Sequence, residues 1–528
     1  MGIPAFFSHI VKNHASIIKK LSANTIHINN LYLDCNSIVY DAVYNIDFTS
    51  LQESDVDTII KAVCNKIDEY IKLINPDNSV YIAFDGVAPV AKLEQQRSRR
   101  YKSLYQNGIM RSIHKNTKAD PWNTTAITPG TQFMTKLNEK IYNNYKNSTK
   151  YNVKSIIVSG SDKPGEGEHK LFQHIRDYPD QHREQTTVIY GLDADLIMLS
   201  INHLPISNNI YLFRETPHFI KSINSELEPN ENYVLDIPEL ANIITLDMNN
   251  GKENDKNRIY DYIFLCFFLG NDFMPHFPSI NIRTGGIDKI LNAYKATVGG
   301  TNEVLTDGKQ IYWKNVRKLV QFLAENEEEF IKKEHKLRDR REKNHIPDET
   351  PEDKYKKFDL VPTYERSLEK YINPFTSNWQ VRYYKTLFDL DVDETRKKQI
   401  CTNYLEGLEW TMKYYTTGCP DWRWSYKYNY PPLFSDLIHY IPYFDTEFVD
   451  NKAEDPVSDL VQLCYVLPKQ SLQFLPDKLY NNLIAYHVDW YDTNCSYMWA
   501  YCRYFWEAHV NLPHIDINEL ENFVEKNK

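Results

Sequence analysis

Short apolar segments that end near acidic residues constrain the fold of this chain more than any other feature. Segments rich in β-branched and aromatic residues occur at positions 26–33, 80–84, 155–158, 187–190 and 210–213. Each is typical of a buried strand. Helical stretches separate most of them, and such alternation is typical of a largely parallel sheet. We therefore predict an α/β fold over about residues 1–300, with helices flanking a largely parallel central sheet.

Three of these five segments run into an acidic residue. Asp34, Asp85 and Asp193 follow the first, second and fourth segments. In sheets of this kind, the carboxyl ends of the strands form the ligand crevice. We therefore expect these three carboxylates to converge on one edge of the sheet.

Two pairs of acids are spaced two residues apart, beside glycine or proline. They are Glu166 with Glu168, and Asp193 with Asp195. A helix would turn two such side chains about 200° apart, whereas an extended or turn backbone can aim both the same way. Gathered carboxylates repel one another unless cations neutralise them, and Mg²⁺ or Mn²⁺ suits carboxylate oxygens. The alternative is that these are ordinary exposed acids at strand and helix ends, without a shared role.

A further acid, Asp272, follows an apolar segment at 263–269 within the run Gly-Asn-Asp-Phe. By itself it is equally consistent with a simple turn at the end of a helix.

A basic segment begins seven residues after Asp85. Residues 92–102 carry five basic residues against one acid, although the whole chain has a net charge of −10. Four side chains in this region fall at helical positions i, i+4, i+7 and i+8, which is one helix face: Lys92, Gln96, Arg99 and Arg100. Such a face suits a terminal phosphate. A solvated basic face or a nuclear import signal is the alternative.

The second half of the chain has a different character. Residues 313–341 are charge-laced and free of Gly and Pro, which predicts one long exposed helix that bridges two parts. Residues 343–357 are polar and contain two prolines, so we expect a loop or mobile linker there. We divide the chain into an α/β domain (1–300), the long helix with its linker (301–357), and a mostly helical, aromatic-rich region (358–528).

Rings alternate with basic groups in the segment 420–430, which contains Trp422 and Trp424. Aromatic rings stack on unpaired bases with little sequence preference, at roughly 1–3 kcal/mol per base. They can equally form core, which is the better reading for most of these rings.

Composition excludes several classes of protein. Hydrophobic residues make up 42% and charged residues 25% of the chain, which is typical of a soluble globular protein. The longest apolar run, 259–269, is shorter than the roughly 20 residues that span a bilayer. The eight cysteines form no CxxC pair, so we expect reduced, mostly buried thiols and a cytosolic or nuclear setting.

The chain resembles the XRN family of 5′→3′ exoribonucleases through most of its length. The runs that carry the resemblance stand in the family order: GIPAFF (2–7), LYLDCN (31–36), FDGVAP (84–89), PGEGEHK (164–170), YGLDADLIML (190–199), LGNDFMPHFPSINIR (269–283), EGLEW (406–410), GCPDWRWSYKYNYPP (418–432) and VLPKQSLQFLP (466–476). The resemblance implies that 1–300 is a catalytic domain with a core like that of PIN and flap nucleases. It also implies that 358–528 completes the active-site pocket.

The resemblance also assigns roles to residues. The family's catalytic, metal-binding acids become Asp34, Asp85, Glu166, Glu168, Asp193, Asp195 and Asp272. Its pocket for a 5′-terminal phosphate becomes Lys92, Gln96, Arg99 and Arg100, the set that helical periodicity selects independently. The residues implied to stack on the terminal base are Tyr40 with Trp422 or Trp424.

The chain departs from the family in three ways. Tyr40 stands where a histidine is usual, so ring stacking is retained but an imidazole function is not. No zinc-knuckle pattern occurs between Arg214 and Asp261, which favours the cytoplasmic branch. The long C-terminal extension of that branch is missing, and the Asn, Ile, Lys and Tyr bias fits an AT-rich, viral genome. We therefore expect a short form in the cytoplasm, with the nucleus, a viral factory or a virion as alternatives.

The implied activity is processive 5′→3′ degradation of 5′-monophosphorylated single-stranded RNA to nucleoside 5′-monophosphates. Two Mg²⁺ ions, replaceable by Mn²⁺, would serve the hydrolysis. Decapped mRNA is the implied substrate, with a decapping enzyme as a partner and no membrane. Three rival functions stay open: a flap-type 5′ nuclease acting on DNA, a phosphatase with a DxD nucleophile, and a noncatalytic RNA-binding scaffold.

Overall fold

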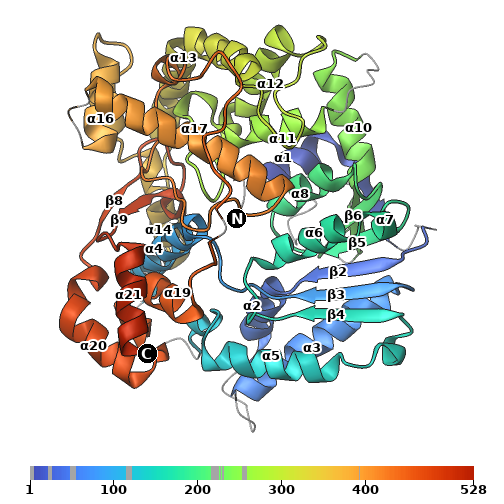
Figure 1. Ribbon diagram of the computed structural model, residues 1–528. Coiled ribbons are helices and arrows are strands. Elements are labelled where there is room, and N and C mark those ends of the chain that lie inside the picture. Colours follow the sequence, from blue (N-terminus) through green and yellow to red (C-terminus); the bar gives the residue numbers. More distant parts are fainter. Residues whose placement is uncertain are drawn as a thin grey trace.

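A seven-stranded sheet flanked by helices forms the centre of the molecule (Figure 1), so the expected α/β fold is confirmed. The computed structural model describes residues 5–21, 26–47, 55–114, 122–215, 225, 227–228, 231–251, 258–389, 391, 393–452 and 454–528. Residues 2–4 of the first family-like run lie outside this part of the chain.

Five neighbouring strands of the sheet are parallel, and two at one edge are antiparallel. The strand order is β1-β7-β6-β5-β2-β3-β4. The parallel strands are β6 (Asn209–Arg214), β5 (Thr186–Tyr190), β2 (Asn30–Asp34), β3 (Ser79–Ala83) and β4 (Ser155–Ser159). The antiparallel pair is β7 (Tyr233–Asp236) and β1 (Ile18–Lys20). All five predicted strands exist, although the first begins at Asn30 and not at position 26. The edge pair was not predicted.

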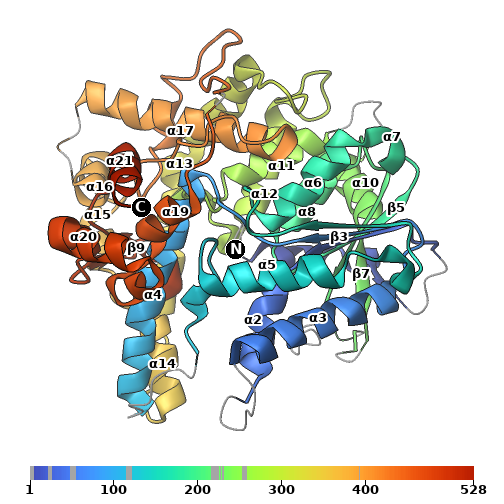
Figure 2. The same ribbon diagram turned by 60° about the horizontal axis from the view of Figure 1, so that its bottom comes forward.

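Helices cover both faces of the sheet (Figures 1 and 2). Leu31 and Leu33 of β2 pack in one core with α2 (Asn36–Asn45), α3 (Asp55–Ile74) and α5 (Gln132–Asn144). Tyr32 points to the other core, with α6 (Gly167–Asp177), α8 (Asp195–His203) and α10 (Ile237–Met248). Burial on both faces explains why this strand is a continuous apolar run.

The second core extends into the C-terminal half of the chain. It takes in α11 (Ile259–Phe267), α12 (Gly286–Thr297), α13 (Trp313–Glu342), α17 (Glu394–Thr416) and α18 (Phe434–Leu437). Helix α1 (Phe6–Asn13) contributes Phe6 and Ile10 to the same core, and α7 (Pro179–His182) contacts α6. Helices α15 (Ser367–Ile372) and α16 (Trp379–Phe388) pack in a separate cluster with Ile331 of α13. The two halves of the chain therefore share one hydrophobic interior.

The predicted long helix is α13, but it is not exposed as expected. Val316, Leu319, Leu323 and Ile331 are all buried, and the helix packs against α12 and α18. Their spacing of three, four and eight residues forms one apolar stripe. Glu327, Glu334 and Arg338 are also buried. Exposed charged residues such as Glu328 and Glu329 occupy the other faces.

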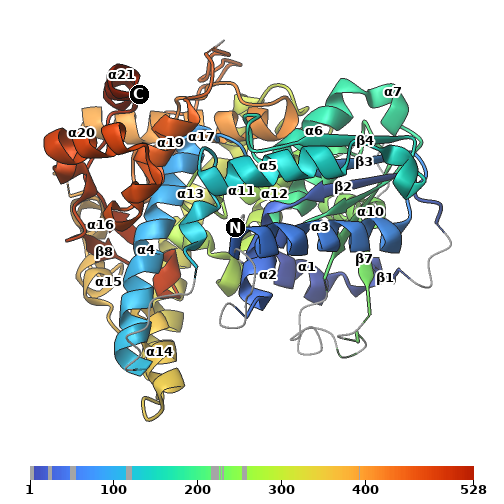
Figure 3. The same ribbon diagram turned by 90° about the horizontal axis from the view of Figure 1, so that it is seen from below.

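Part of the predicted linker is also a helix. Residues 351–359 form α14 (Pro351–Asp359), which begins with a capping box between Thr350 and Asp353 and has proline in its first turn. Proline at the first helical position is favourable, so Pro351 marks a helix start and not a loop. Helix α14 packs against α4 (Val90–His114), and the two protrude together from the body (Figure 3).

The C-terminal region holds α4 from the side opposite the sheet. Leu93 belongs to a core shared with α19 (Asp459–Val466), α20 (Asp477–His487) and α21 (Ile517–Asn527). Buried Arg97 donates to the carbonyls of Pro513 (2.8 Å) and Trp490 (2.9 Å). A short hairpin of β8 (Ser496–Met498) and β9 (His509–Asn511) lies beside it. Helix α4 is thus fixed between the two halves of the chain.

All eight cysteines are free thiols, and six of them are buried, which confirms the expected mostly buried thiols. Among the helices described, none has the length and apolar character needed to cross a membrane.

Two loops pair tightly just beyond the strand ends. The Gly86 N–H donates to the Gly165 carbonyl (2.9 Å), and the Gly165 N–H donates to the Val87 carbonyl (2.7 Å). A Cβ on Gly86 would lie 1.7 Å from the Lys163 carbonyl oxygen. Only glycine permits this approach, which brings the start of α6 against Asp85.

Gly86→Ala should therefore destabilise the protein by about 1–3 kcal/mol, the usual cost of forcing atoms into a packed site. Thermal unfolding followed by circular dichroism measures this. The matched control is Gly108→Ala in α4, where a Cβ meets nothing within 4 Å and alanine favours the helix. A melting temperature for Gly86→Ala equal to that of the control would contradict the expectation.

Candidate active site

The three acids that follow predicted strands converge at one edge of the sheet. Asp34 ends β2, Asp85 lies two residues beyond β3, and Asp193 lies three residues beyond β5. Burial, and then repulsion from Asp85 and Asp193, raises the pKa of Asp34 well above its ordinary value. The expected convergence is confirmed.

Each close pair of acids straddles the beginning of a helix. Glu166 is the N-cap of α6 with extended backbone, and Glu168 lies in the first turn. Asp193 precedes α8, and Asp195 is its first residue. The positive end of a helix dipole favours negative charge at this place. The predicted extended or turn backbone therefore holds only for the first member of each pair.

The carboxylate of Asp85 is held by a network of hydrogen bonds. Asn36 donates from Nδ2 to Asp85 Oδ2 (2.7 Å) and accepts at Oδ1 from the Asp85 N–H (2.9 Å). The Gly167 N–H donates to Asp85 Oδ1 (2.6 Å), and a Cβ on Gly167 would lie 2.5 Å from Asp34 Oδ1. Sequence reasoning gave Asn36 no role, although its position two residues after Asp34 was visible.

Asp272 reaches the cluster from a turn after α11. Gly270 has φ of +85°, and the Asn271 side chain accepts hydrogen bonds from the N–H groups of Phe273 and Met274, each 2.9 Å. The alternative of a helix-end turn is therefore correct as local structure. The same turn carries the Asp272 side chain to Lys92.

Lys92 lies among the acids and not on an open basic face. Its Nζ is 2.6 Å from Glu166 Oε1 and 2.6 Å from Asp272 Oδ2, and its side chain is 11% exposed. Burial alone would lower the pKa of Lys92, but Asp272, Glu166 and Glu168 outweigh it and raise the pKa well above the ordinary value. The lysine therefore stays charged and bridges two carboxylates.

Helix α17 supplies aromatic residues that sequence reasoning did not place at the site. Tyr414 donates to Glu166 Oε2 (2.8 Å). Its ring stacks between Trp410, at 4.8 Å, and His169, at 3.8 Å. Repulsion from Asp195, acting after burial, raises the pKa of the adjacent Tyr415. The aromatic character of 410–415 is the only sequence signal for this wall.

Three carboxylate oxygens of the site lack a hydrogen-bond partner, and a bound cation would satisfy them. Asp34 Oδ1, Glu168 Oε2 and Asp195 Oδ1 are buried without a hydrogen-bond partner. Burial and like charges raise the pKa of Asp195 to about 7 and that of Glu168 well above its ordinary value. Within the described part of the chain, no three His, Cys, Asp or Glu side chains already stand as a ligand set. The donor chemistry nevertheless fits a hard divalent ion.

The other members of the basic face follow Lys92 along α4. Arg99 is exposed and Gln96 is half-buried. Arg100 donates from Nη2 to Thr128 Oγ1 (2.7 Å), while its Nη1 is buried without a partner. Burial lowers the pKa of Arg100 to about 10, and the nearby Tyr40 of α2 opposes that shift. The face and Tyr40 are therefore neighbours.

Trp422 and Trp424, one of which was expected to stack with Tyr40 on a terminal base, lie in different surroundings. Trp424 stacks on buried Trp410, with ring centroids 5.1 Å apart, so one of its faces is occupied by core. Trp422 lines a separate cavity of about 280 Å³ with His169 and Tyr414. Among the described residues, neither tryptophan makes a ring contact with Tyr40. Which ring faces a terminal base stays a prediction.

Comparison with known proteins agrees with this arrangement. The family profile described as "XRN 5'-3' exonuclease N-terminus" matches residues 1–216. The profile described as "Xrn1 helical domain" matches residues 252–366 and 364–528. The chain belongs to the XRN family of 5′→3′ exoribonucleases. The five parallel strands and six of the seven acids lie in the first match, and Asp272, α13 and α17 lie in the second.

Individual relatives cover nearly the whole chain. The "5'-3' exoribonuclease 2 homolog" of Drosophila melanogaster is 26% identical over 98% of this chain and 70% of its own length. The "5'-3' exoribonuclease 2" of Gallus gallus is 26% identical over 100% of this chain and 70% of its own. The "5'-3' exoribonuclease 1" of Saccharomyces cerevisiae is 27% identical over 90% of this chain and 40% of its own. These identities do not separate two branches, so the expected cytoplasmic branch stays a prediction.

The raised pKa values predict how stability depends on pH when divalent ions are chelated. The pKa of Asp195 is about 7 in the folded state against an ordinary 3.8. The folded protein therefore holds a proton that the unfolded chain has released, and stability falls as pH rises from about 4 through about 7. Asp195→Asn removes this contribution. Its melting temperature at pH 8 in EDTA should exceed that of wild type by at least about 2 °C, the shift that roughly 1 kcal/mol gives in a large domain.

The matched control is Asp489→Asn, which neutralises an exposed acid. Its melting temperature should follow that of wild type across the pH range. If wild type and Asp195→Asn gave parallel plots of melting temperature against pH between 4 and 8, the pKa of Asp195 would not be raised in the folded protein.

Proposed function

We propose that this chain is a 5′→3′ exoribonuclease that removes nucleoside 5′-monophosphates from single-stranded RNA bearing a 5′-monophosphate. The observation that carries the proposal is the convergence of seven acids from β2, β3, β5, α6, α8 and the turn after α11 beside one cationic helix. Family membership supports the polarity and the substrate. The names of the relatives refer to exoribonucleases.

The acids would hold two divalent ions, for which we propose Mg²⁺. Asp34, Glu168 and Asp195 offer buried oxygens without partners, so they are the first candidates for direct ligands. Asp85 is held by Asn36 and by the Gly167 N–H, and this fixes the direction of its carboxylate. Bound Mg²⁺ would activate water and stabilise the leaving 3′ oxygen. Tyr414 and Lys92 keep the Glu166 carboxylate in place.

Polarity would come from α4 and not from the acids. A phosphomonoester carries about −1.5 to −2 charges at neutral pH, and Arg99 and Arg100 provide forked donors for it. The buried, partnerless Nη1 of Arg100 is a donor still to be used. Each cut leaves a new 5′-monophosphate on the shortened RNA, so the same contacts can form again. This recurrence supports processive degradation.

The decisive test uses internally labelled RNA with a 5′-monophosphate, 5′-hydroxyl or capped end, together with matched DNA. With Mg²⁺, we expect rapid release of mononucleotides from the monophosphorylated RNA alone and none in EDTA. Asp193→Asn removes one charge from an exposed acid and should lower the rate of hydrolysis at least 10²-fold. The variant should retain the fold and most of its affinity for RNA. Wild-type turnover in that variant, or equal cleavage of DNA, would refute the proposal.

Arg99→Glu should erase the preference for 5′-monophosphate ends, because it reverses an exposed charge on the face that would bind the phosphate. The measurement is the ratio of cleavage rates for monophosphate and hydroxyl ends. Arg111→Glu on the same helix is the matched control, since that arginine lies in the last turn of α4. An unchanged ratio in Arg99→Glu would place the phosphate pocket elsewhere.

A further inference from the structure

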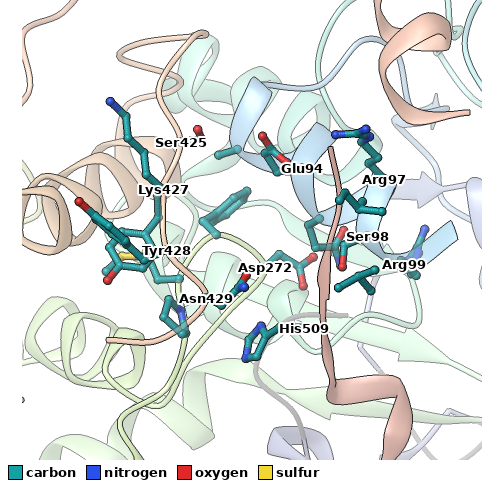
Figure 4. A pocket seen from close by; sticks show the side chains of 18 of the residues that line it. Glu94, Arg97, Ser98, Arg99, Asp272, Ser425, Lys427, Tyr428, Asn429 and His509 are labelled. Carbon is teal, nitrogen blue, oxygen red and sulfur yellow. The ribbon is translucent and has the colours of Figure 1, made fainter. Parts of the chain in front are cut away.

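A large cavity runs along a second side of α4, next to the acid cluster. Its volume is about 870 Å³, within the range of roughly 300–1,000 Å³ that is usual for small-molecule sites. Its walls are α4, the turn around Asp272, the segment 425–429, and the segment 506–517 that contains β9. Figure 4 shows Ser98 and Arg99 of α4 on one side of Asp272, with Lys427 and Tyr428 on the other.

The acids that line this cavity are already engaged. Asp272 binds Lys92 and Glu507 binds Arg283. Asp516 caps α21 by accepting from two backbone N–H groups, and Glu94 accepts from the Tyr465 hydroxyl. Each negative group therefore has a cation or a hydrogen-bond donor of its own.

Two cations of the same walls, Lys102 and Arg97, form no ion pair within the described part of the chain and have only neutral hydrogen-bond partners. Lys102 donates to the Trp506 carbonyl (2.8 Å), and Arg97 donates to the carbonyls of Pro513 and Trp490. A carbonyl satisfies a donor but does not cancel its charge. Burial lowers the pKa of Lys102 to about 8, and the nearby Cys502 and Glu507 offset this shift only in part, as expected for a desolvated ammonium. With exposed Arg99 beside them, these residues make the cavity attractive to an anion.

The cavity also offers rings for a base. Trp506 is half-buried, and its ring stacks on that of Tyr504. Tyr426 and Tyr428 are half-buried on the opposite wall. Aromatic faces of this kind bind a nucleobase without strong preference for its identity. Phosphate-binding cations and base-binding rings therefore occur in one enclosure.

The cavity meets the candidate active site at two residues. Asp272 belongs both to the acid cluster and to the cavity wall, and Arg99 belongs both to the basic face and to the cavity. A nucleotide released at the acids would therefore be adjacent to this enclosure. A free mononucleotide and the 5′ end of the RNA both carry a phosphomonoester of about −1.5 to −2 charges, whereas an internal phosphate of RNA has a single charge. The cations of the cavity therefore favour a mononucleotide over an internal phosphate of the RNA.

We propose that this cavity is a second nucleotide site, which receives the nucleoside 5′-monophosphate after cleavage and is distinct from the site of the RNA 5′ end. The proposal rests on the exoribonuclease activity proposed above for the origin of its ligand. The residues that bind the ligand's phosphate are Lys102 and Arg97, and the rings of Trp506 and Tyr428 contact its base.

The test measures binding of labelled 5′-AMP by equilibrium dialysis in EDTA, with the protein already saturated by a 5′-monophosphorylated oligoribonucleotide. Wild type should bind one further equivalent of 5′-AMP. Lys102→Gln keeps a donor for the Trp506 carbonyl but loses the charge, and should weaken 5′-AMP binding at least tenfold with unchanged RNA affinity. Lys314→Gln, at an exposed lysine that does not line the cavity, is the matched control.

A second variant tests whether binding of 5′-AMP requires the volume of the cavity. Ser98→Trp places a large ring in the cavity and should abolish the additional 5′-AMP equivalent. In Mg²⁺ it should slow steady-state degradation at least threefold, because product leaves more slowly, while the first cut in a single turnover keeps its rate.

The proposal is overturned if RNA-loaded protein binds no 5′-AMP, if Lys102→Gln and Ser98→Trp leave that binding intact, or if they weaken RNA binding instead. Failure of the exoribonuclease proposal gives a different result. If wild type cleaves no RNA in Mg²⁺ but binds one equivalent of 5′-AMP that Lys102→Gln does not bind, the nucleotide site is supported. Only the assigned origin of its ligand is then wrong.

Discussion

A buried ammonium group between two carboxylates is the interaction on which the arrangement of the site depends. Lys92 joins Glu166, at the start of α6, to Asp272, in the turn after α11. The acids around it are desolvated and repel one another, as the raised pKa values of Asp34, Glu168 and Asp195 show. Desolvation of unpaired charges is expensive, so the cluster persists because a cation, helix N-termini and backbone N–H groups each take part of the charge.

The same helix carries that cation and links the two halves of the molecule. One side of α4 faces the acids through Lys92, and another is fixed by Arg97 to the carbonyls of Pro513 and Trp490. Arg97 also lines the large cavity, together with Ser98 and Lys102. Catalysis, recognition of the 5′ end and retention of product would therefore share a single rigid element.

The features that depend on short stretches of sequence were predicted correctly. The five parallel strands, α4 and the convergence of Asp34, Asp85 and Asp193 followed from apolar runs, helical periodicity and the position of acids at strand ends. The burial of α13 was missed because its charges concealed the stripe of Val316, Leu319 and Leu323. The edge strands β1 and β7 are too short to give a pattern of their own. The contacts of Tyr414 and Lys92 could not be foreseen, because they depend on how distant helices pack.

The hydrogen bonds of Arg97 have a consequence for how far the chain can be shortened. The residues that accept them lie near the end of the chain, whereas the acids lie in its first 272 positions. A gene fragment encoding only the sheet would carry most of the acids and Lys92 but not the supports that orient α4. A chain cut back to the sheet would therefore lose the contacts that orient α4, so the arrangement of the site needs both regions.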